Sequence, residues 1–226
     1  MVEFEIFENK MRYYLKKYNI NYNDAIINNF YIFTKYLLSE NEKYNLTSIL
    51  QIDEIIVKHY IDSIMILKYF KIQKNAKIID IGTGAGFPAL PLYIMRNDLR
   101  ITFLDSTAKK INFIKNAAGQ INGEPKEFIY YSGRAEQYGQ NPKIRESYDI
   151  ALMRAVAKLS VLCELGAPYI NPEGFFVAYK GKNAENEITE AQNAIKRLDL
   201  QITETVKFEL ENETKRTLIK IQKSFT

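Results

Sequence analysis

The chain has 226 residues, of which 46% are hydrophobic and 26% charged, values typical of a globular protein with a buried core. A net charge of +4 at pH 7 permits a polyanionic partner without requiring one, and the single cysteine, Cys163, excludes an intramolecular disulfide or a cysteine metal cluster. The N-terminus is acidic where a signal peptide is basic, and no apolar run reaches membrane-spanning length, so we expect a cytosolic protein without a membrane partner.

Residues 4–70 contain neither glycine nor proline and show helical periodicity. They predict about three helices, with breaks near 19–23 and 41–48 and a third helix from about 52 to 70. That helix carries His59, the only histidine of the chain, for which a packing role competes with a chemical one. We assign 1–72 to an N-terminal helical subdomain and 73–226 to the main domain. Whether the helices pack on the sheet, dock on a partner, or do both stays open.

The stretch from Lys77 to Leu92 predicts a strand, a tight turn and a helix. Gly82, Gly84 and Gly86 let the backbone turn sharply and come close to a ligand, because they lack a Cβ atom. The dinucleotide fingerprint places its third glycine three residues after its second, where this chain has Phe87. The spacing instead resembles the S-adenosylmethionine loop of class I methyltransferases, although an ordinary turn of another α/β protein stays an alternative.

From residue 77 onward, strand and helix patterns alternate, which implies a parallel sheet with right-handed crossovers. Strands are expected near 77–81, 101–105, 127–131, 148–153 and 174–180. The pattern then changes to two strand-like runs, 201–209 and 215–222, whose polar connection predicts a hairpin. We therefore predict an α/β protein with the Rossmann-like fold of class I S-adenosylmethionine-dependent methyltransferases, a mostly parallel seven-stranded sheet that ends in an antiparallel hairpin.

Polar residues follow each predicted strand, at the edge where open α/β sheets bind ligands. Asp105 follows the second strand, where a carboxylate can accept hydrogen bonds from both ribose hydroxyls of an adenosine. It would serve NAD as well as S-adenosylmethionine. The alternative is that Asp105 only caps the N-terminus of the next helix. Ala135 and Glu136 follow the third strand and are placed to meet an adenine edge, while Arg134 could face a phosphate. Arg154 follows the fourth strand.

Seven motifs of this chain resemble, in order, those of one bacterial family, the small-subunit ribosomal RNA guanine-N7 methyltransferases, also called glucose-inhibited division protein B. They are YNLTSI at 44–49, KHYIDS at 58–63, DIGTGAGFPALPL at 80–92, LDSTAKK at 104–110, GRAE at 133–136, RAVA at 154–157 and YKG at 179–181. Ala89 departs from the family, which commonly has glycine there. The resemblance implies an enzyme that uses S-adenosylmethionine to methylate N7 of a guanine in 16S rRNA (position 527, in the 530 loop), with the small ribosomal subunit as its partner.

The same resemblance, together with the glycine spacing, implies a set of site residues. The expected cofactor-binding residues are Gly82, Gly84, Gly86, Phe87, Asp105, Ala135, Glu136 and Arg154. Arg154 is also expected to position the substrate, without a general base, because guanine N7 attacks with its lone pair and no proton leaves first. The candidates for RNA binding are Lys109, Lys110, Arg134, Lys180 and Lys182, for which a solvated basic rim is the alternative. No metal is expected, and the mild charge favours a monomer.

Two other functions stay open at this stage. A nicotinamide-dependent oxidoreductase is disfavoured by Phe87 in the third-glycine position. A non-catalytic RNA-binding module on a methyltransferase scaffold is disfavoured because Gly82, Asp105 and Glu136 are all present. The chain also lacks the Pro-Cys nucleophile for pyrimidine C5 and the Asn/Asp-Pro-Pro-aromatic element for exocyclic amines. Guanine N7, the acceptor that the resemblance implies, needs neither, so their absence is consistent with it.

Overall fold

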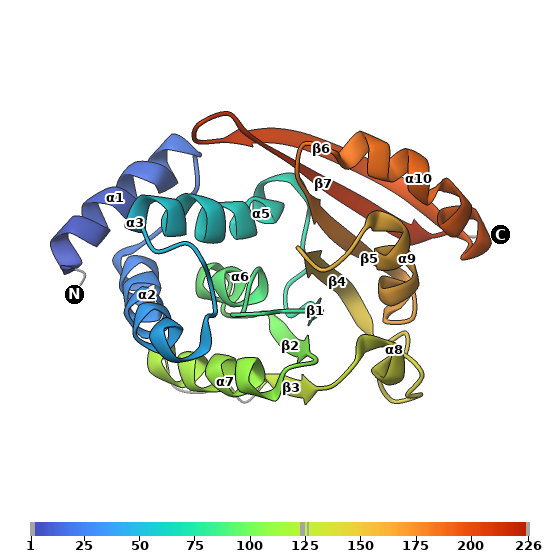
Figure 1. Ribbon diagram of the computed structural model, residues 1–226, viewed down its shortest axis with the longest axis horizontal. Coiled ribbons are helices and arrows are strands. Elements are labelled where there is room, and N and C mark those ends of the chain that lie inside the picture. The colour runs from blue at the N-terminus through green and yellow to red at the C-terminus, as the bar shows by residue number, and fades with distance from the viewer. Residues whose placement is uncertain (1–2, 123–124, 126, 225–226) are drawn as a thin grey trace.

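A seven-stranded sheet with the strand order β3-β2-β1-β4-β5-β7-β6 runs through the centre of the molecule (Figure 1). The structure is a computed structural model that describes residues 3–122, 125 and 127–224. The strands are β1 (Lys77–Ile81), β2 (Arg100–Asp105), β3 (Ile129–Ser132), β4 (Tyr148–Arg154), β5 (Ile170–Lys180), β6 (Leu200–Leu210) and β7 (Thr214–Lys223). Strands β1 to β5 are parallel, and β7 is antiparallel to both of its neighbours, β5 and β6. The predicted mostly parallel sheet with a C-terminal hairpin is confirmed.

The strand order reverses between β1 and β4, and this is the position where open α/β sheets bind their ligands, at the carboxyl ends of the strands. Because β7 is antiparallel, its first residues lie at that same edge, with Thr217 paired to Lys180 at the end of β5. The hairpin therefore extends the ligand-binding edge beyond β5. Strand β5 begins at Ile170, earlier than the expected 174, and its pairing with β4 shifts register between Tyr148 and Ile150.

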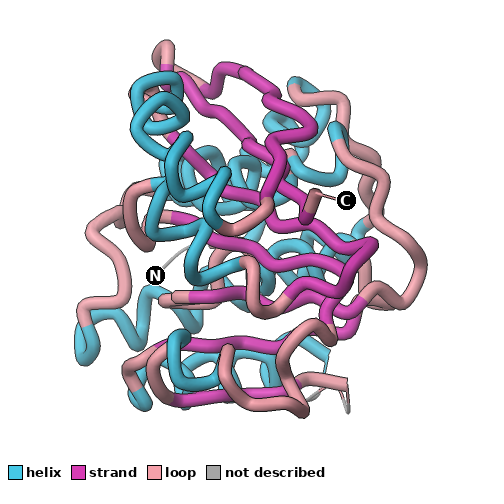
Figure 2. Tube along the Cα trace, turned by 90° about the vertical axis from the view of Figure 1, so that its right-hand side faces the viewer, coloured by secondary structure: helices cyan, strands magenta, loops and turns pink. Residues whose placement is uncertain are grey.

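Helices cover both faces of the sheet (Figure 1, Figure 2). They are α1 (Phe4–Lys17), α2 (Asp24–Tyr44), α3 (Ile52–Glu54), the π-helix η1 (Ile55–Ile61), α4 (Asp62–Ile64), α5 (Ile66–Tyr69), α6 (Ala89–Met95), α7 (Ala108–Asn122), α8 (Ala135–Tyr138), α9 (Leu159–Gly166) and α10 (Ala184–Arg197). The first two predicted N-terminal helices are confirmed. The third helical segment spans 52–69 as expected, but its central part is a π-helix, which the periodicity did not predict.

Alternation of side chains along each strand builds two cores. Along β1, Ile78 belongs to the core under the N-terminal helices, α6 and α7, whereas Ile79 and Ile81 belong to the core under α9 and α10. Both faces are buried, which explains why these strands are nearly continuous apolar runs rather than alternating polar and apolar sequences.

The N-terminal helices share one hydrophobic core with the sheet and its helices. Phe33 of α2 contacts the rings of Phe87 and Phe113, at centroid distances of 5.6 and 6.5 Å. A buried hydrogen bond of 2.7 Å joins Thr34 to Tyr60 and so fixes α2 against η1. Packing on the sheet is thus one role of these helices, and the division at residues 72 and 73 stays a prediction. Within the described residues, we find no helix with the length and apolar character needed to cross a membrane.

Candidate active site

The glycine loop between β1 and α6 has the conformation that its sequence requires. Gly82, Gly84 and Gly86 have φ angles of +70°, +60° and +89°, in the region that residues with a side chain rarely adopt. The backbone N–H of Gly82 donates to the carbonyl of Leu104 (2.8 Å) and so fastens the loop to β2. A Cβ atom on Gly82 would lie 2.7 Å from Val156, so the loop packs directly beneath the segment that follows β4.

Gly84 differs from the other two glycines because the space beside it is open. A Cβ atom on Gly84 would meet only one atom, a backbone oxygen at 4.0 Å. Its φ of +60° alone favours glycine at this position, and the open space also leaves room for a ligand against the loop. This residue therefore fits the close approach of a nucleoside cofactor that the spacing predicted.

Asp80 lies beneath the loop and was not predicted as a site residue. Its Oδ2 atom accepts hydrogen bonds from Thr83 Oγ1 (2.7 Å) and from the backbone N–H of Ala89 (3.1 Å), the first residue of α6. Its side chain is fully buried, and its Oδ1 atom has no partner among the described residues. This burial raises the pKa of Asp80 to about 7. A carboxylate inside an otherwise apolar strand, directly before the glycines, was the available sequence signal.

The raised pKa of Asp80 makes stability depend on pH. The folded chain keeps a proton that the unfolded chain loses near pH 4, so the free energy of unfolding contributed by this group falls as pH rises from about 4 to about 7. Asp80→Asn removes this titration. The free energy of unfolding of the variant, relative to that of the wild type, should therefore rise by on the order of 3 kcal/mol when the pH is raised from 4.5 to 7.5. Urea unfolding at the two pH values measures this difference. A difference that does not change with pH would show that Asp80 titrates normally.

Asp105 joins the end of β2 to the glycine loop. Its Oδ2 atom accepts from the backbone N–H of Gly84 (3.0 Å), and its Oδ1 atom accepts from the N–H of Thr107 (2.9 Å). The carbonyl of Thr107 accepts the hydrogen bond from Ile111 that begins α7, so Asp105 is not itself the N-cap residue. Each carboxylate oxygen retains a second lone pair, which leaves capacity to accept two ribose hydroxyls.

The ends of β2 and β3 are held side by side. The N–H of Gly133 donates to the carbonyl of Asp105 (3.0 Å), and Tyr169 donates from its hydroxyl to the carbonyl of Ala135 (2.6 Å), which anchors the start of α8. Glu136 is exposed on this helix. The structure therefore brings the predicted cofactor residues of β1, β2 and β3 to one half of the ligand-binding edge.

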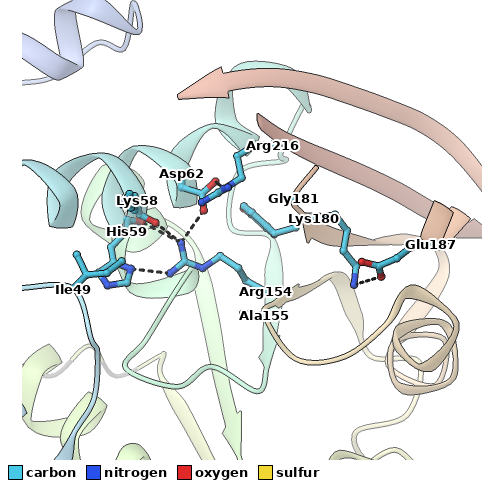
Figure 3. Close-up of a pocket in the computed structure, with 11 residues that line it drawn as sticks. Ile49, Lys58, His59, Asp62, Arg154, Ala155, Lys180, Gly181, Glu187 and Arg216 are labelled. Carbon is cyan, nitrogen blue, oxygen red and sulfur yellow. Dashed lines mark hydrogen bonds and ion pairs between the residues drawn. The ribbon is translucent and has the colours of Figure 1, made fainter. Parts of the chain in front are cut away.

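Arg154, at the end of β4, is held by the N-terminal helical segment (Figure 3). Its Nη1 atom donates to the carbonyls of Lys58 (3.2 Å) and His59 (3.4 Å) and to Oδ2 of Asp62 (3.2 Å). Its guanidinium carbon lies 5.1 Å from the centre of the Phe87 ring. These contacts leave Arg154 mostly buried, with 12% of its side chain exposed, and fix its direction before any ligand binds.

His59 is a neutral, largely buried ring that hydrogen bonds and stacking hold in place. Burial, assisted by the positive charges of Arg154 and Lys58, lowers its pKa to about 3. Arg154 Nη2 lies 3.4 Å from Nδ1, and because arginine only donates, Nδ1 accepts and the ring proton is on Nε2, which donates to Thr47 Oγ1 (2.8 Å). The ring stacks on Phe87 with centroids 4.4 Å apart. Phe87, expected at the cofactor, is thus buried beneath His59 and links the glycine loop to η1.

Asp62 connects two arginines that lie far apart in the sequence. Its Oδ2 atom accepts from Arg154, its Oδ1 atom accepts from Arg216 Nε on β7 (3.2 Å), and only 5% of its side chain is exposed. Neither Asp62 nor Arg216 was predicted as a site residue. Asp62 lies within the KHYIDS motif, which was its signal, whereas Arg216 lies outside all seven motifs and had none.

These side chains line a cavity of about 420 Å³ at the carboxyl ends of β4 and β5 (Figure 3). Its lining residues are Ile49, Lys58, His59, Asp62, Arg154, Ala155, Tyr179, Lys180, Gly181, Glu187 and Arg216. All of them except Glu187 and Arg216 belong to four of the motifs, at 44–49, 58–63, 154–157 and 179–181. Ala155 has a φ of +56°, a backbone strain that is common at functional sites. The folded chain therefore gathers separate motifs around one cavity beside the glycine loop.

The predicted RNA-binding cations are not gathered in one place. Lys109, Lys110 and Arg134 lie near the ends of β2 and β3, and Lys182 follows β5; Lys110 is partly exposed and the other three are exposed. Lys180 differs from the expected exposed cation, because its side chain is buried and its Nζ atom lies 2.6 Å from both Glu187 and the carbonyl of Ala157. It holds the segment after β4 in place against α10.

Known proteins resemble this chain in sequence and in fold. Residues 26–219 match the family described as rRNA small subunit methyltransferase G, GidB. The protein named ribosomal RNA small subunit methyltransferase G of Clostridium botulinum (strain Loch Maree / Type A3) is 41% identical over 206 residues, which cover 91% of this chain and 85% of that protein. The protein of the same name from Clostridium beijerinckii is 43% identical over 192 residues, which cover 84% and 80%.

Solved structures of lower identity share the fold alone. The YcgJ protein from Bacillus subtilis superposes with a TM-score of 0.57 and 14% identity, over 74% of this chain and all of that one. The ribosomal protein L11 methylase from Lactobacillus delbrueckii subsp. bulgaricus gives 0.55 and 11%, over 73% and 78%. The length of the sequence match and the motifs around the cavity lead to one conclusion: this chain belongs to the GidB family of rRNA small subunit methyltransferase G proteins.

Proposed function

We propose that this methyltransferase uses S-adenosylmethionine to methylate N7 of a guanine in 16S rRNA, the guanine at position 527, within the small ribosomal subunit. The observation that carries the proposal is the cavity beside the glycine loop, which four of the family's motifs line. The names of the relatives, which specify the small ribosomal subunit, support the RNA substrate.

The groups of the cavity suit a reaction in which no proton is removed. His59, Asp62 and Glu187 are the lining residues that could take up a proton most readily, and each is engaged: His59 by Thr47 and Arg154, Asp62 by two arginines, and Glu187 by Lys180. Guanine N7 carries an in-plane lone pair and attacks an electrophilic methyl group without losing a proton. Alignment of the two reactants can then supply most of the rate enhancement, up to roughly 7–11 kcal/mol of the barrier.

The residues of β1 to β3 would hold the cofactor, which supplies a sulfonium methyl group when bound. Gly84 leaves room against the loop, Asp105 has lone pairs for the ribose hydroxyls, and Glu136 is exposed at the same edge. These residues adjoin the end of β4, because Val156, which follows that strand, packs over Gly82. Cofactor and target base would thus bind to neighbouring halves of one edge.

Arg154 would contact the base or its phosphate but not N7. An arginine usually reads guanine by donating to both O6 and N7. Here N7 must keep its lone pair for the methyl group, so Arg154 would donate to O6 or to a neighbouring phosphate. The fixed guanidinium favours this restriction, since Nη1 already donates to Asp62 and to the carbonyls of η1.

The alternatives lose support at this point. The family is described as a methyltransferase family, one fold neighbour is named a methylase, and Phe87 fills the position of the third dinucleotide glycine. A non-catalytic RNA-binding module is disfavoured because Gly82, Asp105 and Glu136 are all present at the ligand-binding edge. We further propose that the chain acts as a monomer in the cytoplasm, where its ribosomal substrate is made.

Transfer of a labelled methyl group tests the function. The chain is incubated with tritiated S-adenosylmethionine and either small or large ribosomal subunits from bacteria that lack this gene, and RNA is then separated from protein. We expect label in 16S rRNA of the small subunit and none in the RNA of the large subunit. Label in ribosomal protein, or no label in 16S rRNA, would contradict the proposal.

A further inference from the structure

A second cavity, of about 440 Å³, lies next to the first, and Arg216 lines both. Its walls come from the segment after β5, the start of α10 and the facing ends of β6 and β7. Four of its lining residues are cations, Lys182, Lys207, Lys215 and Arg216, against two carboxylates, Glu185 and Glu209.

The topology of the sheet places these cations beyond Arg154 along the same edge. Lys180 at the end of β5 pairs with Thr217 of β7, and Thr217 pairs in turn with Lys207 of β6. The start of β7 and the end of β6 therefore lie at the carboxyl edge of the parallel strands. The cations of the second cavity extend this edge away from the cofactor half.

Two of the four cations have no carboxylate partner. Lys207 pairs with Glu185, and Arg216 pairs with Asp62 through Nε. Lys182 and Lys215 are both exposed, and across the described ranges neither forms an ion pair or a side-chain hydrogen bond. These two ammonium groups are available to an external anion.

The surroundings of the first cavity leave the side toward the second cavity for an entering polynucleotide. Figure 3 shows Ile49, Lys58 and His59 on one side of Arg154, with Lys180 and Glu187 on the other. The N-terminal segment thus closes one side, and the glycine loop occupies the edge toward β1. A chain that delivers a base to Arg154 can continue past Arg216, over the hairpin.

We infer that the second cavity binds the sugar-phosphate backbone of single-stranded nucleotides that flank the target guanine, an inference that rests on the proposed function. Lysine ammonium groups bind phosphates without reading sequence, and such contacts fix the register of a nucleic acid on a protein. A base can enter a pocket only from an unpaired, splayed-out strand, whose phosphates are then exposed on both sides of it. Lys182 and Lys215 supply the contacts on one of those sides.

Binding of the wild-type chain and of two double variants to small ribosomal subunits tests the inference. The variant Lys182→Gln/Lys215→Gln removes the two free cations. The control Lys71→Gln/Lys74→Gln makes the same change of charge at exposed positions before β1, at the opposite edge of the sheet. Filter binding is measured from low to high salt, with thermal unfolding to confirm that each variant folds and calorimetry to measure the affinity for S-adenosylmethionine.

We expect the Lys182/Lys215 variant to bind subunits about ten-fold more weakly near physiological salt and its log-log salt slope to fall by about 1.4, since each phosphate contact to a single strand contributes about 0.7. The control should retain the wild-type slope, and neither variant should change cofactor affinity. Equal slopes for the two variants would overturn the inference. If the wild-type chain bound subunits but transferred no methyl group, the proposed function would fail, while the comparison of slopes would still decide whether the cavity binds RNA.

Discussion

Replacement of Arg154 with alanine is expected to lower the single-turnover rate of methyl transfer at least 100-fold while the chain still folds. The reason is positional: the guanidinium is fixed by Asp62, by two carbonyls of η1 and by the Phe87 ring, and it lies where the two halves of the edge meet. The loss should appear in the rate at saturating substrate, because the misplacement of a reacting group affects the transition state most strongly.

A matched variant separates the charge of Arg154 from its geometry. Arg154→Lys keeps the positive charge, but a single ammonium group cannot reach Asp62, both carbonyls and His59 together. We expect it to recover less than one tenth of the lost rate. Circular dichroism and urea unfolding serve as the controls for folding, since either variant weakens a buried ion pair. Turnover of the alanine variant within three-fold of the wild type would remove Arg154 from the reaction.

Substitution of Gly84 with alanine should reduce the affinity for S-adenosylmethionine at least 30-fold. The new methyl group would project into the open space over the loop, where the cofactor must approach the backbone. A residue with a side chain at a φ of +60° also costs about 1 kcal/mol of stability, which urea unfolding measures separately.

Gly119 provides the control for Gly84. It lies in α7, and a Cβ atom added there would have no neighbouring atom within 4 Å, so Gly119→Ala should stabilise the helix by about 0.5–1 kcal/mol without a new contact. Its affinity for the cofactor should equal that of the wild type in calorimetry. If Gly84→Ala also bound like the wild type, the open space would not be the cofactor site.

The strands could be predicted because their signals are local. Ile78, Ile79 and Ile81 form a β-branched run between polar breaks, and the three glycines fix the turn that follows. Equally local patterns predicted the hairpin and the first two helices. The π-helix was not predictable in this way, because one altered turn within 52–69 leaves the apolar periodicity of the whole segment nearly unchanged.

The contacts within the site join residues that are far apart in the sequence. The local patterns of a single sequence do not show which of these residues pack together. Arg216 and Asp62 are 154 positions apart, and their hydrogen bond exists because β7 lies beside β5 and α4, which begins at Asp62, contacts β5. The burial of Lys180 likewise depends on Glu187, which α10 brings over the end of β5. Most residues of the cavity lining lie within the motifs, but only Arg154 and Lys180 among them were predicted as site residues. Only the fold shows that these motifs meet, that His59 is neutral and that Lys180 is paired.

The identity of the methylated nucleoside distinguishes guanine N7 from every other methyl acceptor. After transfer of labelled methyl groups to small ribosomal subunits, the 16S rRNA is digested to nucleosides and separated by chromatography with mass detection. We expect the label in 7-methylguanosine, because the cavity can align the two reactants and the groups in it that could act as a base are all engaged. Label in a nucleoside whose formation requires removal of a proton before methyl transfer, such as an exocyclic N-methyl or a ribose methyl product, would contradict it.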